Sequence, residues 1–306
     1  FIDGSAGTTG LRIAERLESR KDIELIKLTE ENRKDINARK AALNSADIAF
    51  LCLPDAAAIE AVSLIDNPNT VVLDTSTAHR TNPDWAYGFP ELSAGAEEKV
   101  KNSKRIAVPG CHASGFISLI YPLIEKGILD KDILLSCFSL TGYSGGGKKM
   151  IAEYEGAERD ELLDAPRQYG IAQTHKHLPE MKAITGINNA PAFIPVVGSF
   201  YSGMEVTIPI FASQLNDGFT VEDIKKTYKE KYNGPVVNYV ESFDEGGFVS
   251  ANKLNGRDSM EISVSGNDDR ILLISRYDNL GKGASGAAVE CMNIVLGVDK
   301  TTGLEL

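Results

Sequence analysis

The first third of the chain alternates short apolar runs with segments of helical periodicity, and this order restricts the fold more than any other feature of the sequence. The runs IAFLCL (48–53) and TVVLD (70–74) are apolar almost throughout, as in parallel strands that are covered on both faces. Between the first two expected strands, helical spacing places Leu11, Ala14 and Leu17 on one face. Strands and helices that alternate with short joints predict a doubly wound α/β sheet.

The rest of the pattern divides the chain in two. The expected strands of the first part are 1–3, 23–28, 48–53, 71–74 and 106–108, and its expected helices are 11–19, 35–42 and 56–65. After about residue 133 the strands carry more polar residues, as in an α+β domain, and are expected at 134–140, 204–211, 236–240, 260–265 and 271–277. A helix is expected at 221–232, with Thr220 and Asp223 as its N-terminal signal. A last helix, 284–296, has a small apolar face that suits packing against the first domain.

Composition narrows the class of protein. The 306 residues are 42% hydrophobic and 25% charged, the profile of an ordinary soluble globular protein, and their number favours two domains. A net charge of −11 without a dense Lys/Arg cluster argues against nucleic-acid and anionic-membrane partners. The four scattered cysteines indicate free thiols in a reducing compartment, and no apolar run approaches the ~20 residues of a membrane-spanning helix. With no secretory leader visible, the cytoplasm is the expected location.

A glycine-rich loop joins the first strand to the first helix. Its residues are Gly4, Ser5, Ala6, Gly7, Thr8, Thr9 and Gly10. This GxxGxxG spacing differs by one residue from the GxGxxG fingerprint, but its physical basis is the same. Glycines let the main chain turn tightly and approach a pyrophosphate at the helix N-terminus, where the two threonine hydroxyls add donors. A turn that serves packing alone is the alternative, and the position at the first strand-to-helix junction favours a dinucleotide site.

The residues at the end of the second expected strand help to distinguish an NAD site from an NADP site. It carries no acidic residue that would hold a ribose 2′-hydroxyl. Glu30 and Glu31 follow, and then Arg33 and Lys34. Nearby positive charge favours a 2′-phosphate and therefore NADP, unless these charges form a solvated loop.

The segment IAVPGCHASGF (106–116) places a cysteine at a strand-to-helix junction. Cys111 begins an apolar helix that is expected to reach about Lys126. The N–H groups and the dipole at a helix start favour an anion, so thiols there attack as thiolates. Gly110 and Gly115 are expected to leave room for substrate beside the sulfur. The alternative, a small buried apolar residue, fits the cysteines that lie inside apolar strands or helices. These are Cys52, Cys137 and Cys291.

Two histidines and a carboxylate gather in the run THKHLPE (174–180). A cysteine nucleophile needs a partner that exchanges protons near neutral pH, and imidazole meets that need. His175 is the expected acid and base, with His177 as the alternative, and Glu180 is expected to orient one ring or to hold a substrate group. His112 is expected to point away from this group. A metal site at this run would lack a third and a fourth ligand at recognisable spacing. The remaining interpretation is that the run forms a polar surface loop.

Two further places could attract an anionic substrate. The run DTSTAHR (74–80) follows the end of a strand, where open α/β sheets bind ligands, and Arg80 could hold a phosphate or a carboxylate bidentately. The run GYSGGGKK (142–149) contains Ser144 and two lysines, and it resembles an N–H nest or else a glycine hinge. The pattern does not rank the two as the phosphate site.

Together these stretches resemble the N-acetyl-γ-glutamyl-phosphate reductase family of arginine biosynthesis, and in particular its shorter form. They are DGSAGTTG (3–10), LCLPDAA (51–57), LDTSTAHR (73–80), YGFPEL (87–92), VPGCHASGF (108–116), TGYSGGGK (141–148), THKHLPEM (174–181) and DNLGKGASGAAVE (278–290). The resemblance implies NADP as cofactor and a Rossmann domain of residues 1–111 and 284–306. It also implies a catalytic and dimerisation α+β domain of residues 112–283, related to aspartate-semialdehyde dehydrogenase.

The resemblance also implies roles for single residues. The nucleophile falls on Cys111 and the acid–base histidine on His175. Substrate contacts fall on Arg80, Ser144, His177 and Glu180. Cofactor contacts fall on Gly4, Ser5, Ala6, Gly7, Thr8, Thr9, Gly10, Pro54 and Gly283. His112 stands where the family pattern leads us to expect tyrosine or a similar residue.

The implied reaction is the NADPH-dependent reduction of N-acetyl-glutamyl 5-phosphate to the 5-semialdehyde through a thioester on Cys111. General motifs separate this substrate poorly from related acyl phosphates of aspartyl or aminoadipyl type. An alternative from a different functional class is a non-catalytic regulator that senses NADP, although such a sensor needs no nucleophile. The architecture commonly assembles into homodimers or homotetramers, and no metal is expected.

Overall fold

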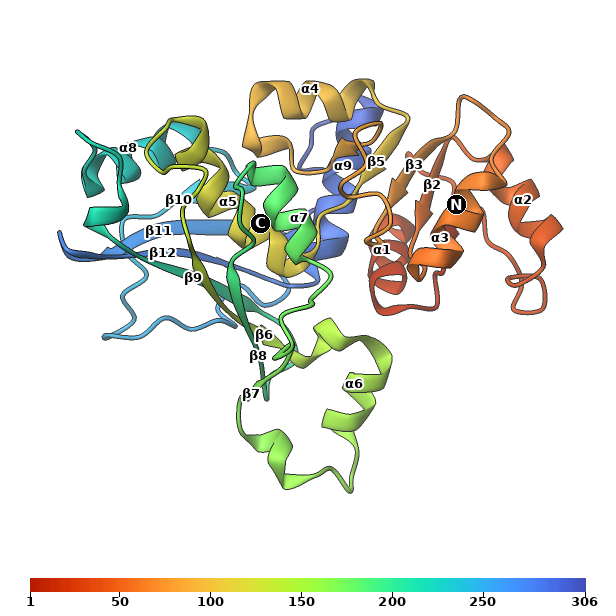
Figure 1. Cartoon of the computed structure of the whole chain (residues 1–306). Helices are drawn as coiled ribbons and strands as arrows, with labels where there is room; N and C mark the ends of the chain where they lie inside the picture. The colour runs from red at the N-terminus through yellow and green to blue at the C-terminus, as the bar shows by residue number, and fades with distance from the viewer. The chain divides into compact units, whose positions relative to one another are not determined.

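The computed structural model describes residues 1–306, the whole of the printed sequence. The chain forms two compact units, which Figure 1 shows in one colour gradient from N- to C-terminus. The first unit consists of Phe1–Gly110 and Ala284–Leu304, and the second consists of Cys111–Gly283 with Glu305–Leu306. None of the helices is both long enough and apolar enough to cross a membrane.

The first unit is built on a five-stranded parallel sheet in the order β1-β2-β3-β5-β4. Its strands are β1 (Ile2–Asp3), β2 (Ile48–Leu51), β3 (Val71–Asp74), β4 (Ala86–Tyr87) and β5 (Arg105–Ala107). Its helices are α1 (Thr8–Glu18), α2 (Ile36–Ser45), α3 (Asp55–Ser63), the 3-10 turn η1 (Pro90–Leu92), α4 (Ala94–Asn102) and α9 (Gly286–Leu296).

Two apolar cores lie in this first unit. One core contains Ile13 of α1 and Val100 of α4 together with the apolar residues of α9. The other contains Leu43 of α2 and Ala58 of α3. Strand β3 contributes Leu73 to the first core and its neighbour Val72 to the second, because successive side chains of a strand point to opposite faces. Helices therefore cover both faces, which confirms the doubly wound sheet.

The strand expected at 23–28 is wrong, because this segment has no regular secondary structure. Its side chains nevertheless pack as the apolar pattern predicts, with Ile23 and Leu25 against one core and Ile26 and Leu28 against the other. Apolar periodicity records which side chains are buried, whereas a strand also needs a neighbour to pair with.

The second unit is a seven-stranded mixed sheet in the order β10-β11-β12-β9-β6-β8-β7. Its strands are β6 (Ser136–Gly142), β7 (Arg167–Gln168), β8 (Ala192–Gly198), β9 (Met204–Phe211), β10 (Val237–Tyr239), β11 (Met260–Gly266) and β12 (Arg270–Tyr277). Its α-helices are α5 (Cys111–Glu125), α6 (Gly147–Glu155), α7 (Leu178–Thr185) and α8 (Val221–Lys231). Short turns are η2 (Tyr143–Gly146), η3 (Glu161–Asp164), η4 (Ala212–Gln214) and the π-helical η5 (Gly281–Ser285). Helix α5 packs on β9 and β12 and is flanked by α7 and α8.

The signal expected at the start of α8 is confirmed. The Asp223 carboxylate accepts hydrogen bonds from the main-chain N–H and from the hydroxyl of Thr220, both at 2.8 Å. This carboxylate satisfies a main-chain donor that the helix itself cannot pair, so it defines where the helix begins.

Two tyrosines at the C-terminal end of α8 donate hydrogen bonds to carbonyls of α5, one of which lacks its usual partner within the helix. Pro122 has no N–H, so the carbonyl of Ser118 loses its usual intrahelical donor. The Tyr232 hydroxyl donates to that carbonyl at 2.6 Å, and the Tyr228 hydroxyl donates at 2.6 Å to the carbonyl of Leu119. Helix α5 therefore stays continuous through a proline, and α8 is fixed against it.

Candidate active site

The helix that begins at Cys111 contains the expected nucleophile. Cys111 is the first residue of α5 and is half-buried. The first N–H groups of a helix lack intrahelical partners, and they favour negative charge on the sulfur. A Cβ atom added to Gly283 would lie 3.1 Å from the Cys111 Cβ, so a side chain at that position would press on the nucleophile.

Three imidazole rings form one cluster in the second unit. The rings of His175 and His177 have centroids 4.7 Å apart, and each lies 5.6 Å from the ring of His112. The expectation that His112 points away is therefore wrong. The first turn of α5 directs it toward the start of α7, so the residue that follows Cys111 joins the expected acid–base histidines. No group of three or more His, Cys, Asp or Glu side chains is arranged to hold a metal ion.

The main chain determines which nitrogen of His175 holds the proton. The N–H of His177 donates to His175 Nδ1 at 3.2 Å, so the neutral ring holds its proton on Nε2. Burial and then the positive charge of Lys176 lower the His175 pKa. Near neutral pH the ring is therefore uncharged and has one N–H, on Nε2, to donate.

His112 is held between two hydroxyl groups. Its Nδ1 lies 2.7 Å from Ser139 Oγ and its Nε2 lies 2.6 Å from the Tyr169 hydroxyl. Burial, followed by the nearby His175, lowers the His112 pKa to about 3. Burial and then the charge of Cys111 raise the Tyr169 pKa, so both groups stay neutral. His112 is therefore a member of the cluster that stays neutral and does not carry a proton near neutral pH.

The other expected substrate contacts have different surroundings. Glu180 lies in the first turn of α7 and is almost fully buried. Ser144 is buried in η2, where its oxygen accepts a hydrogen bond from Asn279 Nδ2 at 3.0 Å. Arg80 belongs to the first unit, where its guanidinium donates to the carbonyls of Val108 at 2.9 Å and Thr75 at 2.8 Å.

The glycine loop has the geometry of a dinucleotide turn, and each of its glycines meets a different demand. Gly4 has φ +88°, and a Cβ atom there would lie 2.3 Å from the carbonyl oxygen of Cys52. A Cβ atom on Gly10 would lie 2.5 Å from the Gly4 oxygen, so Gly10 lets α1 pack on the loop. Gly7 has φ −76°, and a Cβ atom there would make only ordinary contacts, at 3.4 Å with the Gly4 oxygen, so the loop itself does not require glycine at this position; this matches the glycine that lets a pyrophosphate approach.

The N-terminus of α1 has capacity for such a ligand. Gly7 is its N-cap residue and provides no side-chain acceptor for the first N–H groups. The Thr8 Oγ1 atom is buried and has no hydrogen-bond partner. A buried hydroxyl without a partner is costly unless a ligand pairs with it, so these residues fit a bound pyrophosphate.

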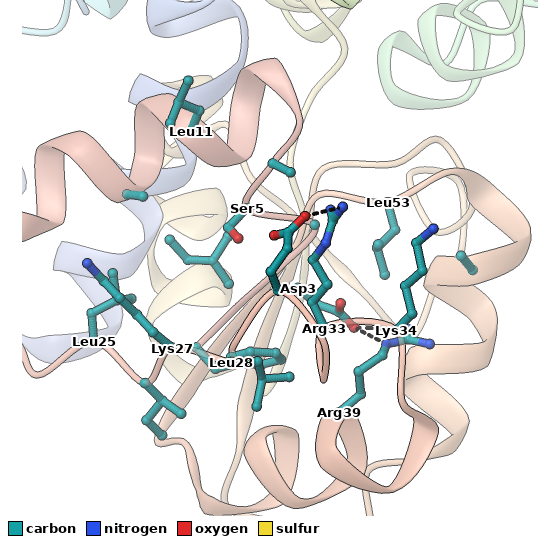
Figure 2. A pocket seen from close by; sticks show the side chains of 18 of the residues that line it. Asp3, Ser5, Leu11, Leu25, Lys27, Leu28, Arg33, Lys34, Arg39 and Leu53 are labelled. Atoms are coloured by element: carbon teal, nitrogen blue, oxygen red, sulfur yellow. Dashed lines mark hydrogen bonds and ion pairs between the residues drawn. The ribbon is translucent and has the colours of Figure 1, made fainter.

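A cavity of about 510 Å³ extends from this loop within the first unit (Figure 2). Gly4, Ser5 and Ala6 line one part, and Leu53 precedes Pro54, the N-cap residue of α3. Besides Lys27, the basic residues on its wall are Arg33, Lys34 and Arg39. Figure 2 shows these three side chains beside the cavity.

Most of these basic residues are already paired with carboxylates, Lys27 with Glu18 among them, but Arg39 is the one whose partners hold it in a buried position. Arg39 Nε and Nη2 each lie 3.0 Å from Asp3 Oδ2, and its Nη1 donates to Glu60 at 2.9 Å. Burial raises the Asp3 pKa, against the lowering effect of Arg39. Arg33 is exposed and pairs only with the equally exposed Glu30, at 2.5 Å. Arg33 and Lys34 are therefore the basic groups best able to meet an anionic ligand.

Comparison with known proteins identifies the family. The family model described as semialdehyde dehydrogenase, NAD binding domain, matches residues 2–102, and the one described as semialdehyde dehydrogenase, dimerisation domain, matches residues 111–279. The N-acetyl-gamma-glutamyl-phosphate reductase 2 of Nostoc sp. is 43% identical over 316 residues, which cover 99% of this chain and 98% of that protein. The N-acetyl-gamma-glutamyl-phosphate reductase of Brucella ovis is 43% identical over 304 residues, covering 97% and 98%. This chain belongs to the N-acetyl-γ-glutamyl-phosphate reductase family.

Solved structures agree on the fold of this reductase family member. Aspartate semialdehyde dehydrogenase II of Vibrio cholerae, complexed with ASA, has a TM-score of 0.74 at 16% identity and covers 97% of both chains. Aspartate semialdehyde dehydrogenase of Candida albicans, solved with NADP, has a TM-score of 0.66 at 16% identity and covers 98% of both chains.

Several residues of the reductase site were not found from the sequence. Ser139, Tyr169 and Tyr277 contact His112 or the main chain of Cys111, and each is distant in sequence from its partner. Gly115 was expected to make room for substrate, and this is wrong. A Cβ atom there would lie 2.5 Å from Val206 and 2.6 Å from the Tyr277 hydroxyl, so the space belongs to the sheet beneath α5.

Proposed function

We propose that this chain catalyses the NADPH-dependent reduction of N-acetyl-L-glutamyl 5-phosphate to N-acetyl-L-glutamate 5-semialdehyde and phosphate. The observation that carries the proposal is Cys111 at the first position of α5, in one unit with the neutral His175. The first unit, with its glycine turn and cavity, is the cofactor-binding domain, and the second is the catalytic domain.

Cys111 begins the reaction. Its thiolate, favoured by the N-terminus of α5, attacks the acyl carbonyl carbon, and the carbon–oxygen bond to phosphate breaks. Phosphate leaves with the bonding pair, and the acyl group stays on Cys111 as a thioester. We assign the substrate contacts to Arg80, Ser144, His177 and Glu180. The guanidinium of Arg80 is held by two carbonyls, so its orientation is set before an anion binds.

His175 serves the second half of the reaction. When bound, NADPH supplies the hydride that reduces the acyl carbon. His175 Nε2–H donates a hydrogen bond to the carbonyl oxygen and stabilises the negative charge that develops on it. The resulting thiohemiacetal anion collapses: its oxygen re-forms the carbonyl, the carbon–sulfur bond breaks, and Cys111 leaves as a thiolate. Because His177 N–H occupies Nδ1, His175 presents its proton from Nε2 only.

Arg33 and Lys34 determine the preference for NADP over NAD in this proposal. The glycine loop, from Gly4 to Gly10, holds the pyrophosphate, and the two exposed cations meet the 2′-phosphate. Replacing both cations with alanine is expected to weaken NADP⁺ binding by at least about 100-fold, since each charged hydrogen bond contributes ~1.5–3 kcal/mol. NAD⁺ binding is expected to stay unchanged.

Calorimetric titration of both dinucleotides checks this expectation. Lys40→Ala is the matched control, because Lys40 is exposed in the same unit, pairs with Asp66 and does not line the cavity. An equal loss of NADP⁺ and NAD⁺ binding in the double variant would mean that Arg33 and Lys34 do not read the 2′-phosphate.

The second unit supports a homodimer. Pro209 and Leu272 face each other on the side of the sheet opposite the buried Val206, and Leu272 and Phe211 are exposed. An apolar sheet face of this kind is stabilised by burial against a second copy. We expect light scattering to give twice the 33.0 kDa of one chain, and Leu272→Asp to give one chain. A single-chain mass for the unaltered protein would contradict this.

The four free thiols are consistent with a protein that acts in the reducing environment of the cytoplasm.

Steady-state kinetics in the reverse direction test the substrate. NADP⁺ reduction is followed with N-acetyl-glutamate semialdehyde and phosphate, beside aspartate semialdehyde and phosphate. The proposal predicts phosphate-dependent turnover of the acetylated compound alone. Turnover of aspartate semialdehyde instead would keep the chemistry and move the substrate. No turnover of either compound, in folded protein that binds NADPH, would favour a regulator that senses NADP.

A further inference from the structure

The hydroxyl of Tyr277 is inserted into the first turn of α5. In a regular helix the N–H of Gly115 would donate to the carbonyl of Cys111, four residues earlier. Here Gly115 N–H donates to the Tyr277 hydroxyl at 3.0 Å, and that hydroxyl donates to the Cys111 carbonyl at 2.6 Å. The tyrosine oxygen thus bridges two main-chain groups of the first turn and attaches the main chain of the nucleophile to β12.

The Tyr277 hydroxyl is tightly enclosed by the residues around it. Tyr277 is fully buried, and Gly115 is the residue whose missing side chain makes room for its oxygen. Burial, and then the charge of Cys111, raise the Tyr277 pKa well above its usual value, although the Gly115 N–H opposes this. The phenol therefore keeps its proton and acts as the donor to Cys111.

Hydrogen bonds also hold the segment that follows Tyr277 in place. The Asp278 carboxylate, which has no solvent exposure, accepts hydrogen bonds from the Ser202 hydroxyl and from the N–H groups of Gly256, Leu280 and Gly281. The Gly283 N–H donates to the Asp278 carbonyl, and Gly283 lies against the Cβ of Cys111. One segment, 277–283, thus holds Cys111 through its main chain and also limits the space beside its side chain.

We propose that Tyr277 is a positioning residue for the nucleophile, whose hydroxyl anchors the first turn of α5 to β12 and so fixes where the Cys111 sulfur lies. The proposal rests on the reductase function proposed above. Without the hydroxyl, the Cys111 carbonyl loses its hydrogen bond to β12, so the first residue of α5 is free to shift. A misplacement of about 1 Å at a reacting atom can cost ~100-fold in rate.

Tyr277→Phe tests the proposal. We expect kcat to fall by about 100-fold while the KM for the semialdehyde changes by less than ~2-fold, because the change acts on the position of the reacting atom. The alkylation of Cys111 by iodoacetamide is measured across pH, with Cys111→Ser as the blank for the other thiols. Its midpoint should move to higher pH, because a hydrogen-bond donor next to the thiolate has been removed.

Tyr232→Phe is the matched control. It also deletes a buried hydroxyl that donates at 2.6 Å to a carbonyl of α5, but at Ser118, two turns from Cys111. A purely structural role for Tyr277 predicts that both variants lose thermal stability and keep kcat and the alkylation profile. That result would overturn the proposal.

A second substitution covers the case in which Tyr277→Phe does not fold. With 4-aminophenylalanine at position 277 an N–H donor remains, and kcat is expected within about 10-fold of the unaltered enzyme. A folded protein of this kind with a 100-fold loss would contradict the bridging role. Because alkylation needs no substrate, it decides the position of Cys111 even if the proposed reaction proves wrong.

Discussion

Replacing Cys111 with serine is expected to lower kcat by at least about 10⁴-fold, because the covalent step loses its nucleophile. A serine hydroxyl is not ionised near neutral pH, whereas a thiol at a helix N-terminus is favoured as thiolate. The glycine loop and the cavity beside it belong to the other unit, so NADPH affinity is expected to remain unchanged. Stopped-assay kinetics and calorimetric titration of the same preparation measure both quantities.

Cys137→Ala provides the comparison within the same unit. Cys137 is fully buried in β6, where burial raises its thiol pKa, so it serves as a small apolar residue. Its replacement is expected to lower stability by about 1 kcal/mol and to leave kcat unchanged. Substantial turnover by Cys111→Ser would remove the thioester from the mechanism.

Gly7→Ala is expected to abolish NADPH binding in a protein that folds normally. The φ of −76° suits alanine, and the nearest atom to the new Cβ would be the Gly4 oxygen at 3.4 Å. Less freedom in the unfolded chain could even add ~0.4–1 kcal/mol of stability. The new methyl group would occupy the space through which the pyrophosphate reaches the main chain, so we expect at least an ~100-fold loss of affinity.

Gly4→Ala separates loss of the cofactor from loss of the fold. Its φ of +88° and the 2.3 Å approach to the Cys52 oxygen both exclude a side chain, so unfolding free energy should fall by about 3 kcal/mol. Denaturant unfolding and NADPH titration of both variants give four values. If Gly7→Ala binds NADPH normally, the pyrophosphate does not lie on this loop.

The sequence predicted the first unit well because its evidence is local. Apolar runs such as residues 48–53 and 71–74 specify strands buried on both faces, and β2 and β3 lie there. The failure at 23–28 concerns pairing, which depends on neighbouring main chain and leaves no mark in the segment itself. Asp3 and Arg39 likewise meet across the fold, 36 residues apart, and only the structure shows this pair.

For the candidate site too, the sequence predicted the features that are local and missed those that depend on distant residues. Cys111 at a strand-to-helix junction is a local feature, so the chemistry could be inferred before the fold. The partners that position it are not local: Tyr169 bonds His112 from 57 residues away, and Tyr277 bonds Cys111 from 166 residues away. A lone tyrosine in an apolar strand gives no sign of such a role. His112 was misjudged because the direction of its side chain depends on the first turn of α5.

The central claim is an acyl group carried on Cys111, and a single-turnover experiment without phosphate tests it most directly. The protein is mixed with NADP⁺ and N-acetyl-glutamate semialdehyde, NADPH formation is followed, and an acid-quenched sample is mapped by peptide mass spectrometry. The account predicts a burst of one NADPH per site and one N-acetyl-glutamyl group on the peptide containing Cys111, removed when phosphate is added. Turnover with phosphate but no acylated Cys111, or acylation at another residue, would contradict it.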